Sequence, residues 1–187
     1  MIRNDTTFVI VGLGLLGGSY AMGLKEAGYR VLGVARRQET IDHALAHHMI
    51  DAGTLDPEEF LDQADIVVFA LYPHIMIDWI HEHQNAFRPG TLLTDVSGVK
   101  VNVADKVQSF LRDDVEFIAA HPMAGRETSG IEYANTEMFH DANYIIVPTE
   151  KNTKEAVETS RQLAEILQFH HIATLSMQEH DEMIGFL

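Results

Sequence analysis

A chain of 187 residues with 46% hydrophobic content is long enough to bury a core, which excludes a small peptide scaffold. The absence of cysteine excludes disulfides, thiolate metal sites and a cysteine nucleophile. The 13 basic and 28 acidic residues give a net charge of −15, which argues against nucleic acid and anionic membranes as partners. The sequence lacks both an apolar run near the roughly 20 residues of a membrane span and a basic leader, so we expect a soluble cytoplasmic protein.

Short β-branched runs alternate with helical patterns along the first half of the chain, which is typical of βαβ units. Residues 7–11 (TFVIV) predict the first strand, and residues 16, 20, 24 and 27 recur at the period of a helix that packs by one face. Further strands are expected at residues 29–35, 65–71, 91–95, 116–120, 144–148 and 171–175. These elements predict a doubly wound, mostly parallel α/β sheet with helices on both faces.

Helix signals fill the gaps between the predicted strands. Asp56 followed by Pro57 and Glu59 predicts a capped helix start. Apolar stripes predict three further helices, namely residues 76, 79, 80, 83 and 87, residues 99, 103, 107 and 110, and residues 156, 160, 163 and 167.

Near the end of the chain, Ser176 and Glu179 form the pattern of a capping box. The helix that it opens carries Met177, His180, Ile184 and Leu187 on one side, where we expect His180 to pack among apolar side chains. An apolar helix face so close to the end predicts that residues 1–175 form one domain and that residues 176–187 begin a truncated helical domain. That region would also make a homodimer.

A glycine pattern directly follows the first predicted strand. Residues 12–17 read G-L-G-L-L-G and open the first predicted helix, as a dinucleotide-binding Rossmann fold requires. Gly12 permits the tight turn, Gly14 lets the backbone approach a pyrophosphate, and Gly17 allows close packing of helix and strand. The helix N-terminus supplies local positive charge, so we assign Gly12, Gly14, Leu15, Leu16 and Gly17 to cofactor binding.

The end of the second predicted strand indicates which dinucleotide binds. NAD-binding folds usually place an acidic residue there for the ribose 2′-hydroxyl, whereas this chain reads Ala35-Arg36-Arg37. Guanidinium groups bind the additional phosphate of NADP by charge-assisted hydrogen bonds. We therefore predict NADP as the preferred cofactor and NAD as the alternative, while a solvated arginine pair is the competing interpretation.

Three segments follow strands whose carboxyl ends should meet at the ligand edge of the sheet. Leu71, Tyr72, Pro73 and Asp95 are assigned to the cofactor from two of these segments, and the third comprises residues 121–130. Removal of hydride from an alcohol carbon needs a base for the hydroxyl proton, and histidine titrates near neutral pH. His121 is therefore the candidate base. His43 and His47 share a helix face but lack further ligands in their neighbourhood, so no metal site is expected.

Four motifs, GLGLLGGS, TDVSGVK, HPMAGRETSG and HDEMIGF, together resemble the prephenate/arogenate dehydrogenase family of tyrosine biosynthesis over the whole chain. The resemblance implies oxidative decarboxylation of a cyclohexadienol: hydride passes to the nicotinamide, the ring carboxylate leaves as CO2, and an aromatic ring forms. His121 would take the hydroxyl proton. The resemblance also implies that this chain is the cofactor half of an enzyme, poorly active alone.

The chain departs from the family pattern at one catalytic position. Family members commonly read T-D-x-G-S-V-K, whereas Ser97 and Gly98 stand here in reversed order, so Gly98 occupies the serine place. Ser97 is kept as a catalytic candidate. Candidate substrate residues are Gly98, Lys100, Arg126 and Glu127, with Glu127 a candidate partner for the amine of arogenate.

Two other functions remain open at this point. One is another Rossmann dehydrogenase, of the β-hydroxyacid or imine reductase type. The other is a non-catalytic module that senses a dinucleotide and signals to a partner through its last helix.

Overall fold

The computed structural model describes residues 1–125 and 127–186. Its strands are β1 (Thr7–Val11), β2 (Arg30–Val34), β3 (Ala52–Thr54), β4 (Ile66–Phe69), β5 (Leu92–Asp95), β6 (Glu116–Pro122), β7 (Asn143–Val147) and β8 (His171–Thr174). The α-helices are α1 (Leu15–Glu26), α2 (Gln38–Ala46), α3 (Pro73–His83), α4 (Val103–Phe110), α5 (Lys154–Ile166) and α6 (Met177–Gly185).

The strands form one 8-stranded sheet in the order β3-β2-β1-β4-β5-β6-β7-β8. All neighbouring strands run parallel except β6 and β7, which pair antiparallel. The chain leaves β1 toward β2 on one side and later returns to place β4 on its other side. This reversal is the switch point at which ligands bind in doubly wound sheets.

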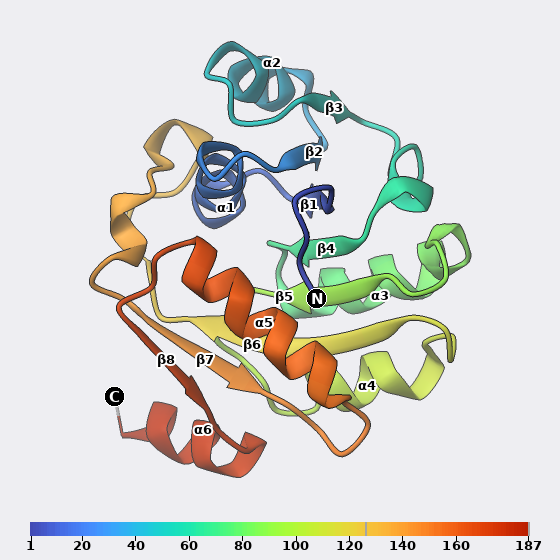
Figure 1. Cartoon of the computed structure of the whole chain (residues 1–187), viewed down its shortest axis with the longest axis vertical. Helices are drawn as coiled ribbons and strands as arrows, with labels where there is room; N and C mark the ends of the chain where they lie inside the picture. The colour runs from blue at the N-terminus through green and yellow to red at the C-terminus, as the bar shows by residue number, and fades with distance from the viewer. Residues whose placement is uncertain (126, 187) are drawn as a thin grey trace.

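Side-chain alternation along β1 divides the core into two layers. Phe8 and Ile10 join the apolar cluster that contains residues of α1 and α5, whereas Val9 and Val11 join the cluster that contains residues of α3 and α4. Figure 1 shows α5 crossing one face of the sheet, with α3 and α4 on the opposite side. The predicted mostly parallel, doubly wound Rossmann-type fold is therefore confirmed.

The segment before β4 corrects one predicted helix. Residues 57–60 form turns and are followed by a short 3-10 helix, Leu61–Gln63, instead of an α-helix starting at Asp56. The Thr54 hydroxyl bonds the Glu59 carboxylate and also accepts from the Asp56 amide at 3.0 Å. Glu59 is thus held in a side-chain turn and is not free to complete a helix cap.

Three further features differ from the sequence expectation. The three-residue strand β3 was not expected, because Ala52-Gly53-Thr54 has no β-branched run. β6 extends to Pro122, so His121 lies within a strand opposite Ile145 and not in the loop that follows. In addition, α4 begins at Val103, which leaves Val99 outside the helix and exposed.

The last helix begins as the sequence predicts. Ser176 and Glu179 form a complete capping box, and His180 is fully buried. Leu187, expected on the same apolar side, lies outside the described residues. Among the helices that the structure describes, none is long and apolar enough to cross a membrane.

Candidate functional site

The turn between β1 and α1 is shaped by glycines that have no room for a side chain. Gly12 has φ +92°, and a Cβ atom there would lie 2.5 Å from the carbonyl oxygen of Ala70. A Cβ atom at Gly17 would lie only 1.8 Å from the carbonyl oxygen of Gly12. These two positions require glycine for the fold itself.

Gly14 differs from them, because a Cβ atom there would meet no atom of the described residues within 4 Å. Its missing side chain leaves open space beside the first amides of α1. Gly14 is the N-cap of that helix, no side chain of the described residues caps it, and no acidic residue lies in the first turn. The exposed N–H groups and the helix dipole therefore form an anion-binding end with room for a phosphate.

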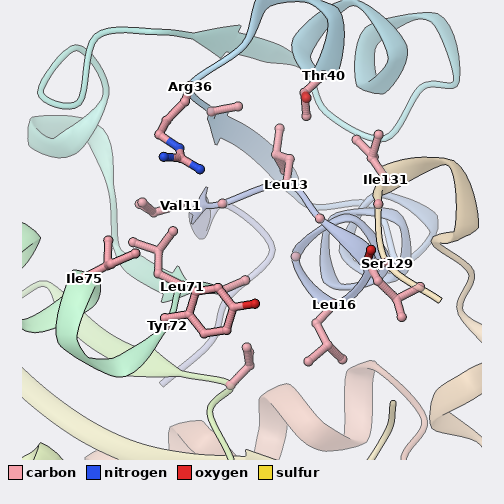
Figure 2. A pocket seen from close by; sticks show the side chains of 18 of the residues that line it. Val11, Leu13, Leu16, Arg36, Thr40, Leu71, Tyr72, Ile75, Ser129 and Ile131 are labelled. Atoms are coloured by element: carbon pink, nitrogen blue, oxygen red, sulfur yellow. The ribbon is translucent and has the colours of Figure 1, made fainter. Parts of the chain in front are cut away.

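A cleft of about 1130 Å³ opens in front of this helix end. Figure 2 shows Leu13 and Leu16 from the glycine loop side, Leu71 and Tyr72 after β4, and Ser129 from the loop after β6 around the same space. Thirteen residues predicted for the site line the cleft: Gly12, Gly14, Leu15, Leu16, Gly17, Ala35, Arg36, Arg37, Leu71, Tyr72, Pro73, Ser97 and Gly98.

The arginine pair lies at the far end of the cleft, just after β2. Both side chains are exposed, and Figure 2 shows Arg36 extending its guanidinium into the cleft. The ion pairs made by arginines among the described residues involve Arg3, Arg88, Arg112 and Arg161. Because Arg36 and Arg37 take no part in these pairs, their donors are available to an anionic ligand.

Behind the cleft, β5 ends in a buried ion pair. The carboxylate of Asp95 accepts from the Lys100 ammonium at 2.6 Å and from the Ala120 amide at 3.1 Å. The Ser97 hydroxyl donates to the same carboxylate at 2.5 Å. Burial lowers the pKa of Lys100, although Asp95 acts in the opposite direction.

This cluster keeps the side chains of two predicted ligand residues away from the surface of the cleft. The side chains of Asp95 and Lys100 are both 0% exposed, so neither is available to a cofactor or substrate in this structure. Their ion pair closes the turn that carries Ser97 and Gly98, and the bond from the Ala120 amide joins the end of β5 to β6. Ser97 lines the cleft, but its hydroxyl is bonded to Asp95 and not to His121.

His121 lies on β6 directly behind Gly98. His121 is not among the cleft-lining residues, but a Cβ atom at Gly98, which does line the cleft, would lie 3.1 Å from Nε2 of His121. This nitrogen therefore lies next to the edge of the cleft. Burial, the charge of Lys100 and the neighbouring His180 lower the pKa of His121 to about 4, and Asp95 opposes them. The imidazole is therefore neutral at pH 7, as a proton acceptor must be.

Sequence reasoning missed the partner of His121. Nδ1 of His121 lies 2.9 Å from Nε2 of His180, a fully buried side chain of α6. His180 is buried as expected, but it also contacts the candidate base, 59 residues away in sequence. Only the H-D motif that contributed to the family resemblance singled this residue out.

The remaining candidates lie in the loop after β6. Glu127 is exposed and is not among the cleft-lining residues, whereas its neighbours Gly125, Thr128 and Ser129 do line the cleft. Arg126 lies outside the described residues. Sequence reasoning also missed Glu39, Thr40, His43 and Trp79, which line the cleft from α2 and α3.

The fold and this cleft together define a nucleotide-binding domain of the Rossmann class. The family model described as "Prephenate dehydrogenase, nucleotide-binding domain" matches residues 20–172. The chain belongs to this prephenate/arogenate dehydrogenase nucleotide-binding domain family.

Individual relatives agree with this assignment. The chain is 31% identical to a prephenate dehydrogenase of Bacillus subtilis over 97% of its own length and 49% of the relative's. It superposes on an arogenate dehydrogenase of Synechocystis with a TM-score of 0.89 and 28% identity, covering 96% of this chain and 63% of that one. A prephenate dehydrogenase from A. aeolicus, in complex with hydroxyphenyl propionate and NAD+, gives a TM-score of 0.87 at 25% identity, covering 96% and 63%. The chain thus spans about half the length of the curated relatives it matches.

Proposed function

We propose that this chain is the cofactor-binding half of a dehydrogenase that converts prephenate to 4-hydroxyphenylpyruvate, or arogenate to tyrosine. The observation that carries the proposal is Nε2 of a neutral His121 facing Gly98 at the cleft edge. Membership of the prephenate dehydrogenase family supports this choice of substrate over that of other Rossmann dehydrogenases.

The residues of the chain divide the work between binding and proton transfer. A bound nicotinamide dinucleotide supplies a hydride acceptor. The free amides of α1 would hold its pyrophosphate beside Gly14. His121 would accept the proton of the ring hydroxyl as the hydride leaves the same carbon. The electrons of the broken bond to the carboxylate then complete the aromatic ring as CO2 departs, and His121 returns the proton to the phenolate oxygen. Aromatisation of the ring drives this step, so orientation is the main task of the protein.

The reversed Ser97-Gly98 pair shapes this proposal. Gly98 leaves space next to Nε2 of His121, where a side chain would lie in close contact. The Ser97 hydroxyl is engaged by Asp95 at 2.5 Å. We infer that His121 meets the substrate hydroxyl without a serine between them.

An activity assay tests the proposal on the complete natural polypeptide that contains these residues. With NADP+ and either prephenate or arogenate, we expect reduction of the nicotinamide together with release of CO2. His121→Gln should lower kcat by about 10²-fold or more, because general base catalysis contributes 10²–10⁴-fold. The exposed His140→Gln should be unaffected.

Two results would contradict the proposal. One is full activity of His121→Gln, which would favour a base elsewhere, as in another type of Rossmann dehydrogenase. The other is cofactor binding with turnover of neither substrate, which would favour a dinucleotide-sensing module.

We further propose that the cofactor is NADP rather than NAD. Arg36 and Arg37 are both exposed at the cleft and form no ion pair with another described residue, so they offer donors for a 2′-phosphate. NAD is the alternative, because NAD+ is bound in the prephenate dehydrogenase of A. aeolicus and because Glu39 also lines this end of the cleft.

Fluorescence of Trp79, the single tryptophan and a cleft residue, can follow both cofactors. We expect NADP+ to bind at least tenfold more tightly than NAD+, about 1.4 kcal/mol. The double variant Arg36→Ala/Arg37→Ala should abolish this preference, whereas Arg30→Ala, bonded to Gln63 away from the cleft lining, should keep it. Equal or tighter binding of NAD+ to the unaltered chain would overturn the NADP assignment.

A further inference from the structure

The contact between His121 and His180 continues to a carboxylate. Nδ1 of His121 lies 2.9 Å from Nε2 of His180, and Nδ1 of His180 lies 3.2 Å from a carboxylate oxygen of Asp181. His180 is fully buried, and Asp181 at the other end of this row is partly exposed. Three side chains from β6 and α6 therefore form one hydrogen-bonded row that ends next to Gly98 of the cleft.

We propose that His180 is a positioning residue that, together with Asp181, fixes the proton of His121 on Nδ1 and its lone pair on Nε2. The inference rests on the proposed role of His121 as the base. It adds that His180, 59 residues away in sequence, determines which ring nitrogen of His121 can accept a proton.

The donor and acceptor roles follow from the carboxylate end of the row. An ionised carboxylate only accepts hydrogen bonds, so Nδ1 of His180 carries the hydrogen. A neutral His180 then has an unprotonated Nε2, which can only accept. Nδ1 of His121 must therefore be the donor, and the lone pair of the neutral ring falls on Nε2.

The nitrogen freed in this way is the one that faces the cleft. Nε2 of His121 lies 3.1 Å from the place of a Cβ atom on Gly98, which lines the cleft. The opposite tautomer would present an N–H there and could take no proton from a hydroxyl. The row also remains intact when His121 is protonated, because Nδ1 still donates to His180. His180 and Asp181 can thus stabilise the positive charge of the protonated His121 ring.

Nitrogen NMR of this chain, labelled with 15N-histidine, tests the assignment without any cofactor or substrate. We expect His121 at pH 7 to show a protonated Nδ1 and an unprotonated Nε2. His180→Leu removes the acceptor, so the Nε2–H tautomer that a free imidazole prefers should become the major form. His180→Gln can place an oxygen near the former Nε2 and should restore the Nδ1–H form.

Changes at α6 that leave His180 in place provide matched controls. Asp181→Ala should raise the Nε2–H fraction of His121, whereas Glu182→Ala on the exposed neighbouring position should leave it unchanged. A wild-type His121 in the Nε2–H form would overturn the inference, as would a tautomer that is unaffected by both His180→Leu and Asp181→Ala.

The activity of the complete natural polypeptide separates this inference from the proposed function. His180→Leu should reduce kcat at least tenfold with a smaller change in KM, and His180→Gln should recover most of the loss. If the polypeptide has no dehydrogenase activity but His121 shows the Nδ1–H form, the proposed function fails and the positioning assignment stands. If activity requires His121 but His180→Leu retains full kcat, the positioning role is overturned.

Discussion

Asp95 and Lys100 form an ion pair without solvent contact, and its energetic importance lies in what happens when one partner is lost. Both side chains are 0% exposed, and their charged groups lie 2.6 Å apart. A buried charge is tolerated when it is paired and hydrogen-bonded, but removal of one partner leaves the other uncompensated. Asp95 also accepts from the Ala120 amide, so its carboxylate joins β5 to β6 behind the site.

We therefore predict that Lys100→Met lowers the free energy of unfolding by about 3–5 kcal/mol. Urea denaturation followed by circular dichroism measures the change. The exposed Lys106→Met on α4 is the control and should change stability by less than about 0.5 kcal/mol. A similarly small effect of Lys100→Met would show that the buried pair is not needed for stability.

His121 makes a second residue-scale prediction, on the dependence of stability on pH. Its pKa is lowered from 6.5 to about 4 in the folded chain, chiefly by burial. Between these pH values the unfolded state takes up a proton at this residue and the folded state does not. The contribution of His121 to stability is therefore complete above pH 6.5 and is lost as the pH falls toward 4.

The comparison of unaltered chain and His121→Gln isolates this contribution. Urea denaturation at several pH values between 7 and 4 should give a steeper loss of stability for the unaltered chain than for the variant. Parallel curves for the two proteins would contradict the lowered pKa of His121.

At the scale of elements, the turn from β1 to α1 separates a folding requirement from a binding requirement. A methyl group at Gly17 would overlap the carbonyl of Gly12, whereas a methyl group at Gly14 would project into open space. Gly17→Ala should therefore destabilise the chain. Gly14→Ala should fold normally and bind dinucleotide at least tenfold more weakly, because the added methyl occupies the phosphate space.

Thermal unfolding and cofactor titration of both variants check this prediction. Gly14 has φ −90°, so alanine introduces no backbone strain there. Unchanged dinucleotide affinity in Gly14→Ala would mean that the phosphates do not lie against this turn.

Elements with strong periodicity could be predicted from the sequence, and elements held by side-chain turns could not. The strands rich in Val and Ile were placed to within one or two residues, because buried parallel strands need such runs. The short β3 has no such run and forms because it can pair with β2. The helix expected at Asp56 does not form, and the Glu59 carboxylate that was expected in its first turn bonds the Thr54 hydroxyl instead.

The candidate site shows the same division. The glycine turn and the arginine pair could be predicted because each acts through residues adjacent in the chain. The burial of Lys100 and the contact of His121 with His180 could not, because they depend on how β5, β6 and α6 pack together. Sequence spacing carries no information on such contacts.

The whole molecule combines a strong negative charge with a site for an anion. At a net charge of −15, long-range attraction cannot bring a dinucleotide phosphate to the chain. Binding must come from local groups, namely the amides at the start of α1 and the two arginines after β2. The division at residue 175 and the homodimer through the C-terminal helix stay predictions.

The most direct test of this account is a titration of the chain with NADP+ followed by residue-resolved amide NMR shifts. We predict one saturable site, with the largest shifts at Gly14 to Gly17, at Arg36 and Arg37, and at Ser97 and Gly98 along the cleft. Such a pattern would place the phosphates at α1 and the nicotinamide near His121. An absence of saturable binding, or shifts confined to residues outside the cleft, would contradict the central claim that this cleft is the dinucleotide site.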